Sequence, residues 1–305
     1  MSSRGAIETE TVRPELVEGV RNNMQQARPE RHSGSVQLRY EGRLAIVTLS
    51  NPAKLNAMSR HMWQQLRSVF DSILGNKDAC CVLILGAACG DLKVFSAGGD
   101  ISEYPSFRFN EVSLRDFHET DVWGGLQAML ACDVPIVAQI DGACMGAGLE
   151  IASCCDIRIA GASSKFGAPI AKLGFPMAPK ETALVINAVG GLTAREMLLE
   201  AAVFDADTML QRGFLNRVVA DAEVADSAMQ SVKRILALAP QAARLNKQTF
   251  RALNKPLAGV FIADTAINSI ANTTIDNPYA YAESAEHQEG INAFIAKRKP
   301  IWNKD

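Results

Sequence analysis

Hydrophobic positions near the start of the folded part alternate with polar ones and then recur at helical spacing. The run VQLRYEGRLAIVTLS, which begins at residue 36, is interrupted by a Glu-Gly pair, a pattern that predicts a hairpin of two strands. After the loop NPAKLNAM, apolar residues recur at helical spacing over residues 62–74, and Ser59 stands where it can cap that helix. We therefore expect the folded body to begin at about residue 36.

Strand, turn and helix patterns then repeat. The apolar run CCVLILGA predicts a buried strand and precedes the small-residue loop FSAGGDI, and an amphipathic helix is expected from Leu114 to Cys132. The next unit contains the strand PIVAQI, the glycine-rich turn DGACMGAG, the helix LEIASCC and the strand DIRIAGA. This order of elements indicates an α/β core over residues 36–192.

The two ends of the chain differ from this core. From residue 193 the pattern is mostly helical, with helices expected at 194–202, 222–238, 240–253, 257–274 and 289–297. We therefore expect residues 193–305 to form a helical C-terminal region. Residues 1–35 contain five arginines, five acidic residues and no Phe, Tyr or Trp. They bury too little apolar surface to offset the entropy of ordering, so we expect a mobile N-terminal extension.

Composition and charge limit the classes of function. The chain has 305 residues, of which 48% are hydrophobic, and 31 Lys and Arg residues nearly balance 33 Asp and Glu residues. A net charge of -2 provides no broad positive field, so we expect no nucleic-acid partner. No apolar stretch approaches the roughly 18 residues that span a bilayer, and the N-terminus lacks the apolar core of a secretory signal. We expect a cytoplasmic protein without membrane attachment.

Cysteine and histidine residues do not follow a metal-binding pattern. The seven cysteines lie in apolar or small-residue surroundings without a C-x-x-C pair, and the four histidines are scattered. This usage is typical of reduced thiols in a core, and we expect no metal site.

The glycine-rich turn contains Gly142, Gly146 and Gly148 and allows several interpretations. Its spacing could indicate a nucleotide loop, but a short-chain dehydrogenase would also carry a Y-x-x-x-K motif, and no tyrosine here is followed by lysine at that spacing. Alternatively, the first N–H groups of the following helix, together with those of the loop at residues 95–101, could donate to a developing oxyanion. Both loops could also be no more than tight turns.

Four segments resemble a known family: NPAKLNAM, VFSAGGDI, DGACMGAGLEIASCCDIRIAGASSKFGAP and GINAFIAKRKPIW. In sequence and order they are similar to the enoyl-CoA hydratase/isomerase family, or crotonase superfamily, over about residues 36–303. The resemblance implies a crotonase-type spiral of repeated strand-strand-helix units and a C-terminal helical region that builds homotrimers, often paired into homohexamers. It also implies an acyl-CoA thioester substrate, with coenzyme A as part of that substrate and no separate cofactor.

The resemblance also implies the reacting groups. The thioester carbonyl oxygen would lie between the backbone N–H groups of Ala97 and Ala147, and the reaction would pass through an enolate-like intermediate. Glu150 matches one of the two glutamates with which hydratases move protons. The position of the second glutamate is occupied by Ile170, in the segment FGAPI, and isoleucine can neither donate nor accept a proton.

Contacts with the ligand are implied at further positions. Lys54 matches a residue near the nucleotide phosphates, and Phe294 and Lys297 match residues that relatives offer to the adenine and phosphates, often from a neighbouring subunit. A lysine at a helix end could equally complement the helix dipole. Residues 104–117, together with Phe261, are expected to line the acyl pocket.

Ile170 leaves the reaction type open. Each group that could replace the missing glutamate is also typical of a solvated surface. These groups are Glu103, His118, Glu119, Asp121 and Glu181. Enoyl-CoA hydration, a carbon-oxygen lyase reaction of fatty acid metabolism, is the first interpretation. Isomerisation, decarboxylation and thioester hydrolysis at the same oxyanion site are alternatives, and a protein that binds acyl-CoA without turnover is an alternative of another class.

Overall fold

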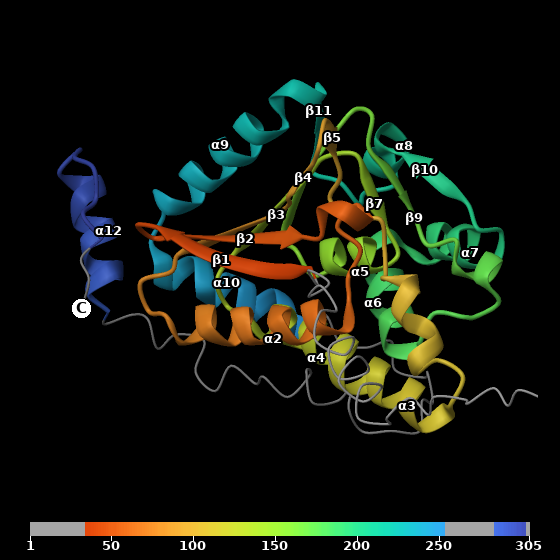
Figure 1. Cartoon of the computed structure of the whole chain (residues 1–305). Coiled ribbons are helices and arrows are strands. Elements are labelled where there is room, and N and C mark those ends of the chain that lie inside the picture. The colour runs from red at the N-terminus through yellow and green to blue at the C-terminus, as the bar shows by residue number, and fades with distance from the viewer. Residues whose placement is uncertain (1–33, 254–283, 303–305) are drawn as a thin grey trace, which may run out of the picture. The chain divides into compact units, whose positions relative to one another are not determined.

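The structure is a computed structural model that describes residues 34–253 and 284–302, and its main element is a six-stranded sheet (Figure 1). The strand order is β1-β2-β3-β6-β8-β11. β1 and β2 form the predicted antiparallel hairpin, and the other neighbouring strands are parallel. The six strands are β1 (Ser35–Glu41), β2 (Leu44–Ser50), β3 (Cys81–Gly86), β6 (Ile136–Ile140), β8 (Ile157–Gly161) and β11 (Arg217–Val219).

Short strands form two further sheets. A three-stranded sheet has the order β10-β9-β7, with β7 (Ala143–Met145), β9 (Lys165–Gly167) and β10 (Val203–Asp205), and a small hairpin joins β4 (Ala88–Cys89) to β5 (Leu92–Lys93). β10 and β11 lie between the helices expected in the mostly helical C-terminal region, where no element is predicted. Strands of three residues are too short to show an alternating pattern, which explains why the sequence does not predict them.

Helices occupy the connections between strands. The α-helices are α2 (Arg60–Gly75), α3 (Glu111–Asp116), α4 (Trp123–Ala131), α5 (Ala147–Ser153), α6 (Pro179–Val189), α7 (Gly191–Leu199), α8 (Ala206–Gln211), α9 (Val224–Leu236), α10 (Pro240–Leu253) and α12 (Ala285–Ile295). The 3-10 helices are η1 (Pro52–Lys54), η2 (Ile101–Ser106), η4 (Ile170–Leu173) and η5 (Asp221–Glu223), and η3 (Phe117–Val122) is a π-helix.

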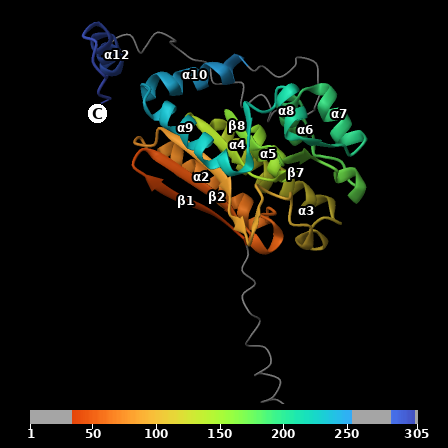
Figure 2. The ribbon, with the colours of Figure 1, turned by 90° about the horizontal axis from the view of Figure 1, so that it is seen from above.

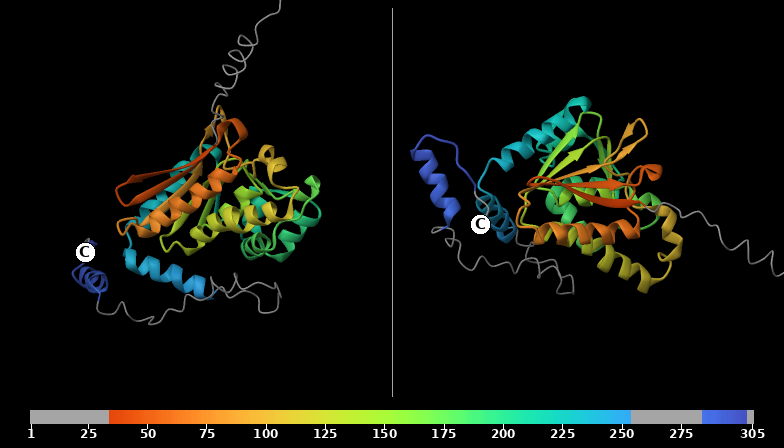
Figure 3. Two further views of the ribbon diagram at one scale, coloured as in Figure 1. Left: turned by 60° about the horizontal axis from the view of Figure 1, so that its bottom comes forward. Right: turned by 60° about the vertical axis from the view of Figure 1, so that its left-hand side comes forward.

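The six-stranded sheet is covered on both faces. α2 lies on one face and packs on α4, whereas α9 lies on the opposite face (Figures 1 and 3). Alternate residues of β2 divide between these layers: Val47 belongs to the hydrophobic cluster that contains Trp63 of α2, and Ile46 belongs to the cluster that contains Val232 of α9. Burial of each side chain of this size contributes about 1.5–3 kcal/mol to folding. β2 is therefore a central element of two hydrophobic layers.

The sequence predicts the start of α2 more accurately than that of α3. The Ser59 hydroxyl oxygen accepts a hydrogen bond from the backbone N–H of Met62 at 3.2 Å, which confirms the expected cap. The helix expected from Leu114 to Cys132 instead begins at Glu111 and contains the π-helical segment η3. A π-helical turn changes which side chains face the core, and apolar periodicity alone does not predict it.

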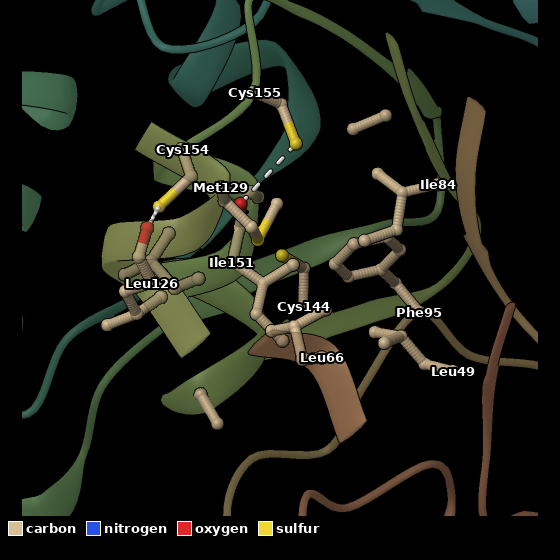
Figure 4. Close-up of a cluster of buried hydrophobic side chains, with 14 of the residues drawn as sticks. Leu49, Leu66, Ile84, Phe95, Leu126, Met129, Cys144, Ile151, Cys154 and Cys155 are labelled. Carbon is tan, nitrogen blue, oxygen red and sulfur yellow. Dashed lines mark hydrogen bonds between the residues drawn. The ribbon is translucent and has the colours of Figure 1, made fainter. Parts of the chain in front are cut away.

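The cysteines are buried thiols in the core. Figure 4 shows Cys144, Cys154 and Cys155 among apolar side chains, and the thiol of Cys155 donates to the Ile151 carbonyl oxygen at 3.4 Å. Burial raises the pKa of the Cys155 thiol to about 12, so this group stays neutral. Within the described ranges, no cluster of His, Cys, Asp or Glu side chains is arranged to hold a metal ion.

Some expectations fall on parts of the chain that the structure does not describe. The helix expected at residues 257–274, Phe261, and the N-terminal extension apart from its last two residues lie outside the described residues. The described residues on both sides of the boundary expected at residue 192 belong to one compact unit. No helix within the described ranges has both the length and the apolar character needed to cross a membrane. The homotrimer or homohexamer stays a prediction.

Candidate active site

The loop at residues 95–101 and the glycine-rich turn lie side by side and are joined by backbone hydrogen bonds. Phe95 N–H donates to the Asp141 carbonyl oxygen at 2.8 Å, and Ser96 N–H donates to that of Ala143 at 3.0 Å. In return, Met145 N–H donates to the Ser96 carbonyl oxygen at 2.9 Å. These bonds exceed what two independent tight turns would make, and they bring the two expected sets of N–H donors together.

Glycine is required where these segments approach most closely. Gly142 has a φ of 64°, and a Cβ atom there would lie 2.2 Å from the Lys93 carbonyl oxygen. At Gly148, in the first turn of α5, a Cβ atom would lie 2.9 Å from the Cβ of Ser96. A side chain at either position would push the two segments apart.

One of the two expected oxyanion donors is already engaged in a hydrogen bond within the protein. Ala97 N–H donates to the Leu55 carbonyl oxygen at 3.0 Å, so the prediction that it binds substrate is wrong. Gly99, two residues later, lines the pocket, and its N–H makes no hydrogen bond with any described residue. Ala147, the first residue of α5, also lines the pocket, and its N–H has no partner within the helix because of this position. The available pair of amides is therefore Gly99 and Ala147.

A small pocket of about 60 Å³ opens at these amides. Its walls are mostly apolar and come from η2, η3, α5, α6 and the segment around η4, whose first residue, Ile170, lies in the wall. Tyr104 and Phe117, from the segment expected to line the acyl pocket, also line it, and the binding of an acyl chain here stays a prediction. Its ionisable residues are Tyr104, Arg108, His118, Glu150 and Glu181. A few polar groups that converge in an apolar pocket are typical of a ligand or active site.

Glu150 projects from the short helix α5, whose first residue is Ala147. Its side chain is 7% exposed, and its backbone N–H donates to the Gly146 carbonyl oxygen at 3.0 Å. Burial raises the pKa of the Glu150 carboxyl group well above its usual range, and the neighbouring charge of Glu181 raises it further. Both effects favour the protonated carboxylic acid, which can donate a proton.

Glu181 and His118 form a second polar group in the same pocket. Glu181 lies in the first turn of α6, which packs beside α5 (Figure 2), and is 3% exposed. Its Oε1 atom lies 2.8 Å from the Nδ1 atom of His118. The sequence favours a surface position for both residues, which is wrong for Glu181. The positions of these two side chains depend on the π-helical segment η3 and on the packing of α5 on α6. No local sequence pattern predicts the π-helical segment or the helix packing.

The other three candidate groups are engaged outside the pocket. The Glu103 carboxylate accepts a hydrogen bond from the backbone N–H of Arg60 at 2.8 Å, at the start of α2. Asp121 is buried in an ion pair with the Arg60 guanidinium, with 2.5 Å between Oδ2 and Nε. Glu119 forms an ion pair with Lys180. None of the three acids lines the pocket.

Tyr104 lies against the amide of Gly99. A Cβ atom at Gly99 would be only 2.2 Å from the Tyr104 hydroxyl oxygen. Burial, partly offset by the positive charge of Arg108, raises the pKa of the Tyr104 phenol to about 12, with a smaller upward contribution from nearby acidic groups. The hydroxyl group therefore stays neutral and borders the available amide.

The expected coenzyme A contacts are only partly described. The Nζ atom of Lys54 lies 2.5 Å from Asp100 Oδ2 and 2.7 Å from Ser102 Oγ, so this cation is held against the residues that follow Gly99. Lys297 is exposed just beyond α12. The side chain of Phe294 lies outside the described residues. Coenzyme A binding by these positions stays a prediction.

Comparisons with known proteins identify the class to which this fold and site belong. Residues 39–305 match the model of the family described as enoyl-CoA hydratase/isomerase, so the chain belongs to this family and has the crotonase fold. The short-chain-enoyl-CoA hydratase of Clostridium acetobutylicum is 30% identical, over 87% of this chain and 96% of that protein. The human enoyl-CoA hydratase domain-containing protein 3, mitochondrial, is 31% identical, over 85% of this chain and 80% of its own length.

A solved structure agrees with this assignment. An enoyl-CoA hydratase/carnithine racemase from Magnetospirillum magneticum superposes with a TM-score of 0.78 at 34% identity and covers 88% of this chain and 96% of its own. Membership of the family supports a crotonase-type reaction on an acyl-CoA thioester. Some relatives have names that place them in mitochondria, and cytoplasmic residence of this protein stays a prediction.

Proposed function

We propose that the protein hydrates the double bond of a 2-enoyl-CoA thioester. One observation carries this proposal: two buried carboxyl groups, Glu150 and Glu181, line one pocket with two available backbone amides. Hydration adds a hydroxyl group and a proton to adjacent carbons, and it therefore needs one group that accepts a proton and one that donates a proton. A pair of carboxyl groups, one protonated and one ionised, can divide these two roles.

The amides of Gly99 and Ala147 are the proposed donors to the thioester oxygen. When water attacks the β-carbon, the electron pair of the double bond moves toward the carbonyl group, and negative charge develops on its oxygen. Each amide then donates to an enolate rather than to a neutral carbonyl group. Loss of one such donor typically reduces the rate by roughly 10²- to 10³-fold.

Glu181 and Glu150 are the proposed proton acceptor and proton donor. The Glu181 carboxylate, held by His118 Nδ1 at 2.8 Å, accepts a proton from the attacking water. The Glu150 carboxylic acid, whose raised pKa favours the protonated form, donates its proton to the α-carbon. After the addition Glu150 is ionised and Glu181 is protonated, and one proton transfer between the two groups, directly or through water, restores the starting state.

Glu181 can take the proton-transfer role that Ile170 cannot perform. Isoleucine cannot move a proton, yet a carboxyl group reaches the same pocket from α6. Two carboxyl groups are therefore retained: Glu150 at the position that the family resemblance implies, and Glu181 at a different position from the second one. The name of the Clostridium acetobutylicum relative, a short-chain-enoyl-CoA hydratase, also supports hydration.

The test measures kcat/KM on a panel of 2-enoyl-CoA thioesters through loss of the conjugated-thioester absorbance. Glu150→Gln and Glu181→Gln should each reduce kcat/KM by roughly 10²- to 10⁴-fold, because an amide cannot replace a general acid or base. Glu119→Gln is the matched control, since this acid is exposed outside the pocket, and its activity should stay close to that of the wild type.

Other outcomes would replace hydration with another reaction. Full activity of Glu181→Gln would remove this residue from the mechanism. Thermal stabilisation by the thioesters without loss of absorbance would indicate binding without hydration. In that case, turnover of 3-enoyl or malonyl-type thioesters would identify an isomerase or a decarboxylase, release of free thiol would identify a thioesterase, and no turnover of any thioester would identify a non-catalytic binding protein.

A further inference from the structure

Arg108 is a cation in the wall of a mostly apolar pocket, and the proposed hydration does not use it. Its guanidinium contacts two aromatic rings, with the Cζ atom 3.6 Å from the ring centroid of Phe175 and 4.6 Å from that of Tyr104. The planes of the two rings are inclined by 71°, so the planar guanidinium can stack face to face on one ring only and is bordered by the other. Stacking on a ring covers a face of the planar group, whereas its N–H bonds point outward along the edge. The edge therefore stays available for hydrogen bonds.

That edge has few partners in the protein. The Nη1 atom of Arg108 lies 3.4 Å from the Nε2 atom of His118, a long contact, and no other side-chain hydrogen bond of Arg108 involves a described residue. Ion pairs with carboxylates hold other arginines of the described chain, such as Arg212 with Glu196 and Arg251 with Asp133. Arg108 has no such ion pair within the described ranges, although its edge fits a carboxylate that accepts two parallel hydrogen bonds.

The surroundings of Arg108 do not compensate its charge directly. The nearest carboxylate in the pocket is that of Glu181, and His118 already contacts it. Burial lowers the pKa of the Arg108 guanidinium, which means that the pocket removes water from this cation. A pocket made for a hydrocarbon chain would gain nothing from a partly desolvated guanidinium without a carboxylate partner.

We propose that the acyl group bound by this pocket carries a carboxylate, which Arg108 binds along its free edge. This inference rests on the proposed function, since it specifies the substrate of the same site. The substrate class is then an acyl-CoA whose chain ends in a carboxylate, and Arg108 determines specificity. Tyr104 and Phe175 hold the guanidinium plane in position for the two hydrogen bonds.

The test uses saturated thioesters, so that binding is measured without turnover. Titration calorimetry gives the Kd of 4-carboxybutanoyl-CoA and of hexanoyl-CoA, which have acyl chains of similar length and differ in charge. The wild type should bind the carboxylate form about 10- to 100-fold more tightly, as expected for a charge-assisted pair of hydrogen bonds. Arg108→Gln should abolish this preference, whereas Arg108→Lys should retain part of it because lysine keeps the charge and loses the planar fork.

Two controls separate specificity from general damage. Arg195→Gln removes an exposed arginine on α7 and should leave both Kd values unchanged. Free coenzyme A should bind the wild type and Arg108→Gln equally. The proposal is overturned if the wild type binds hexanoyl-CoA as tightly as the carboxylate form, or if Arg108→Gln weakens both thioesters equally. The second result would mean that Arg108 orients His118 or contacts coenzyme A.

Failure of this inference and failure of the proposed function give different results. If hydration is wrong, the carboxylate preference of the saturated thioesters persists although no 2-enoyl thioester is consumed. If the carboxylate inference is wrong and hydration is right, 2-hexenoyl-CoA and 4-carboxy-2-butenoyl-CoA are hydrated with similar kcat/KM. Under both proposals, 4-carboxy-2-butenoyl-CoA is the better substrate by about 10- to 100-fold in wild type and loses this advantage in Arg108→Gln.

Discussion

The contact between Gly99 and the Tyr104 hydroxyl group allows a sharp test of the oxyanion site. In Gly99→Ala, the new Cβ atom would lie 2.2 Å from the Tyr104 hydroxyl oxygen, and the next nearest atoms of the ring would be Cζ at 3.3 Å and Cε1 at 3.7 Å. Restoring ordinary van der Waals separation requires a relative movement of about 1 Å. The ring packs against Phe107, Phe117 and Phe175, so we expect the amide of residue 99 to share the movement.

A displacement of this size predicts a large loss of activity with little loss of binding. Misplacement of a reacting group by about 1 Å can reduce the rate by roughly 10²-fold, so we expect a fall in kcat/KM of about 10- to 100-fold for Gly99→Ala. Tyr104→Phe removes the one atom that collides. The double variant Gly99→Ala/Tyr104→Phe should therefore recover most of the activity of Tyr104→Phe alone, a non-additive result that reports direct contact.

The assay is kcat/KM on a 2-enoyl-CoA thioester for the wild type, both single variants and the double variant. Gly124→Ala is the matched control, because the nearest side-chain atom to its new Cβ would be 3.5 Å away and the residue does not line the pocket. Wild-type activity of Gly99→Ala would refute the assignment of this amide to the oxyanion site. Equal losses in Gly99→Ala and the double variant would refute the role of the hydroxyl contact.

Two further predictions concern stability. Glu150 has a pKa raised above 4.5 in the folded state, so its contribution to stability is present below that pH and is lost as pH rises through the folded pKa. Glu150→Gln should therefore gain stability relative to the wild type as pH rises, by up to about 1.4 kcal/mol per pH unit. Urea unfolding of both proteins at about pH 5 and about pH 8 measures this gain. A difference in unfolding free energy between the two proteins that stays constant with pH would contradict the prediction. Ser59→Ala should lower the unfolding free energy by about 1 kcal/mol through loss of the cap on Met62, and Ser59→Thr, which keeps a hydroxyl group at this buried position, should retain most of the stability.

Local patterns predict the parts of this fold that are held by local interactions. The β1-β2 hairpin and the capped start of α2 follow from alternation, helical spacing and one serine. The strands β7, β10 and β11 do not, because three residues are stabilised by their neighbours in the sheet rather than by their own pattern. The π-helical segment η3 is likewise a result of packing.

The same distinction applies to the candidate site. Ala147 and Glu150 lie within one short segment, and the sequence suggests both. In the loop FSAGGDI, however, three small residues offer similar N–H groups, and only the structure shows that those of Ala97 and Gly98 are occupied, by the Leu55 carbonyl oxygen and by Ser96 Oγ. Glu181 joins the site because α6 packs on α5, a contact between helices that are separated in the chain by two strands and a 3-10 helix.

The two kinds of group in this pocket respond differently to evolutionary change. The proposed oxyanion donors at Gly99 and Ala147 belong to the main chain, so exchange of a side chain leaves their N–H groups in place unless the new side chain displaces the backbone, as expected for Gly99→Ala. Proton carriers and specificity groups are side chains, and a single codon change can remove or introduce one. Under the proposed function, a lineage with this scaffold can therefore move a carboxyl group from one helix to another, or acquire a guanidinium, while it keeps the two main-chain donors.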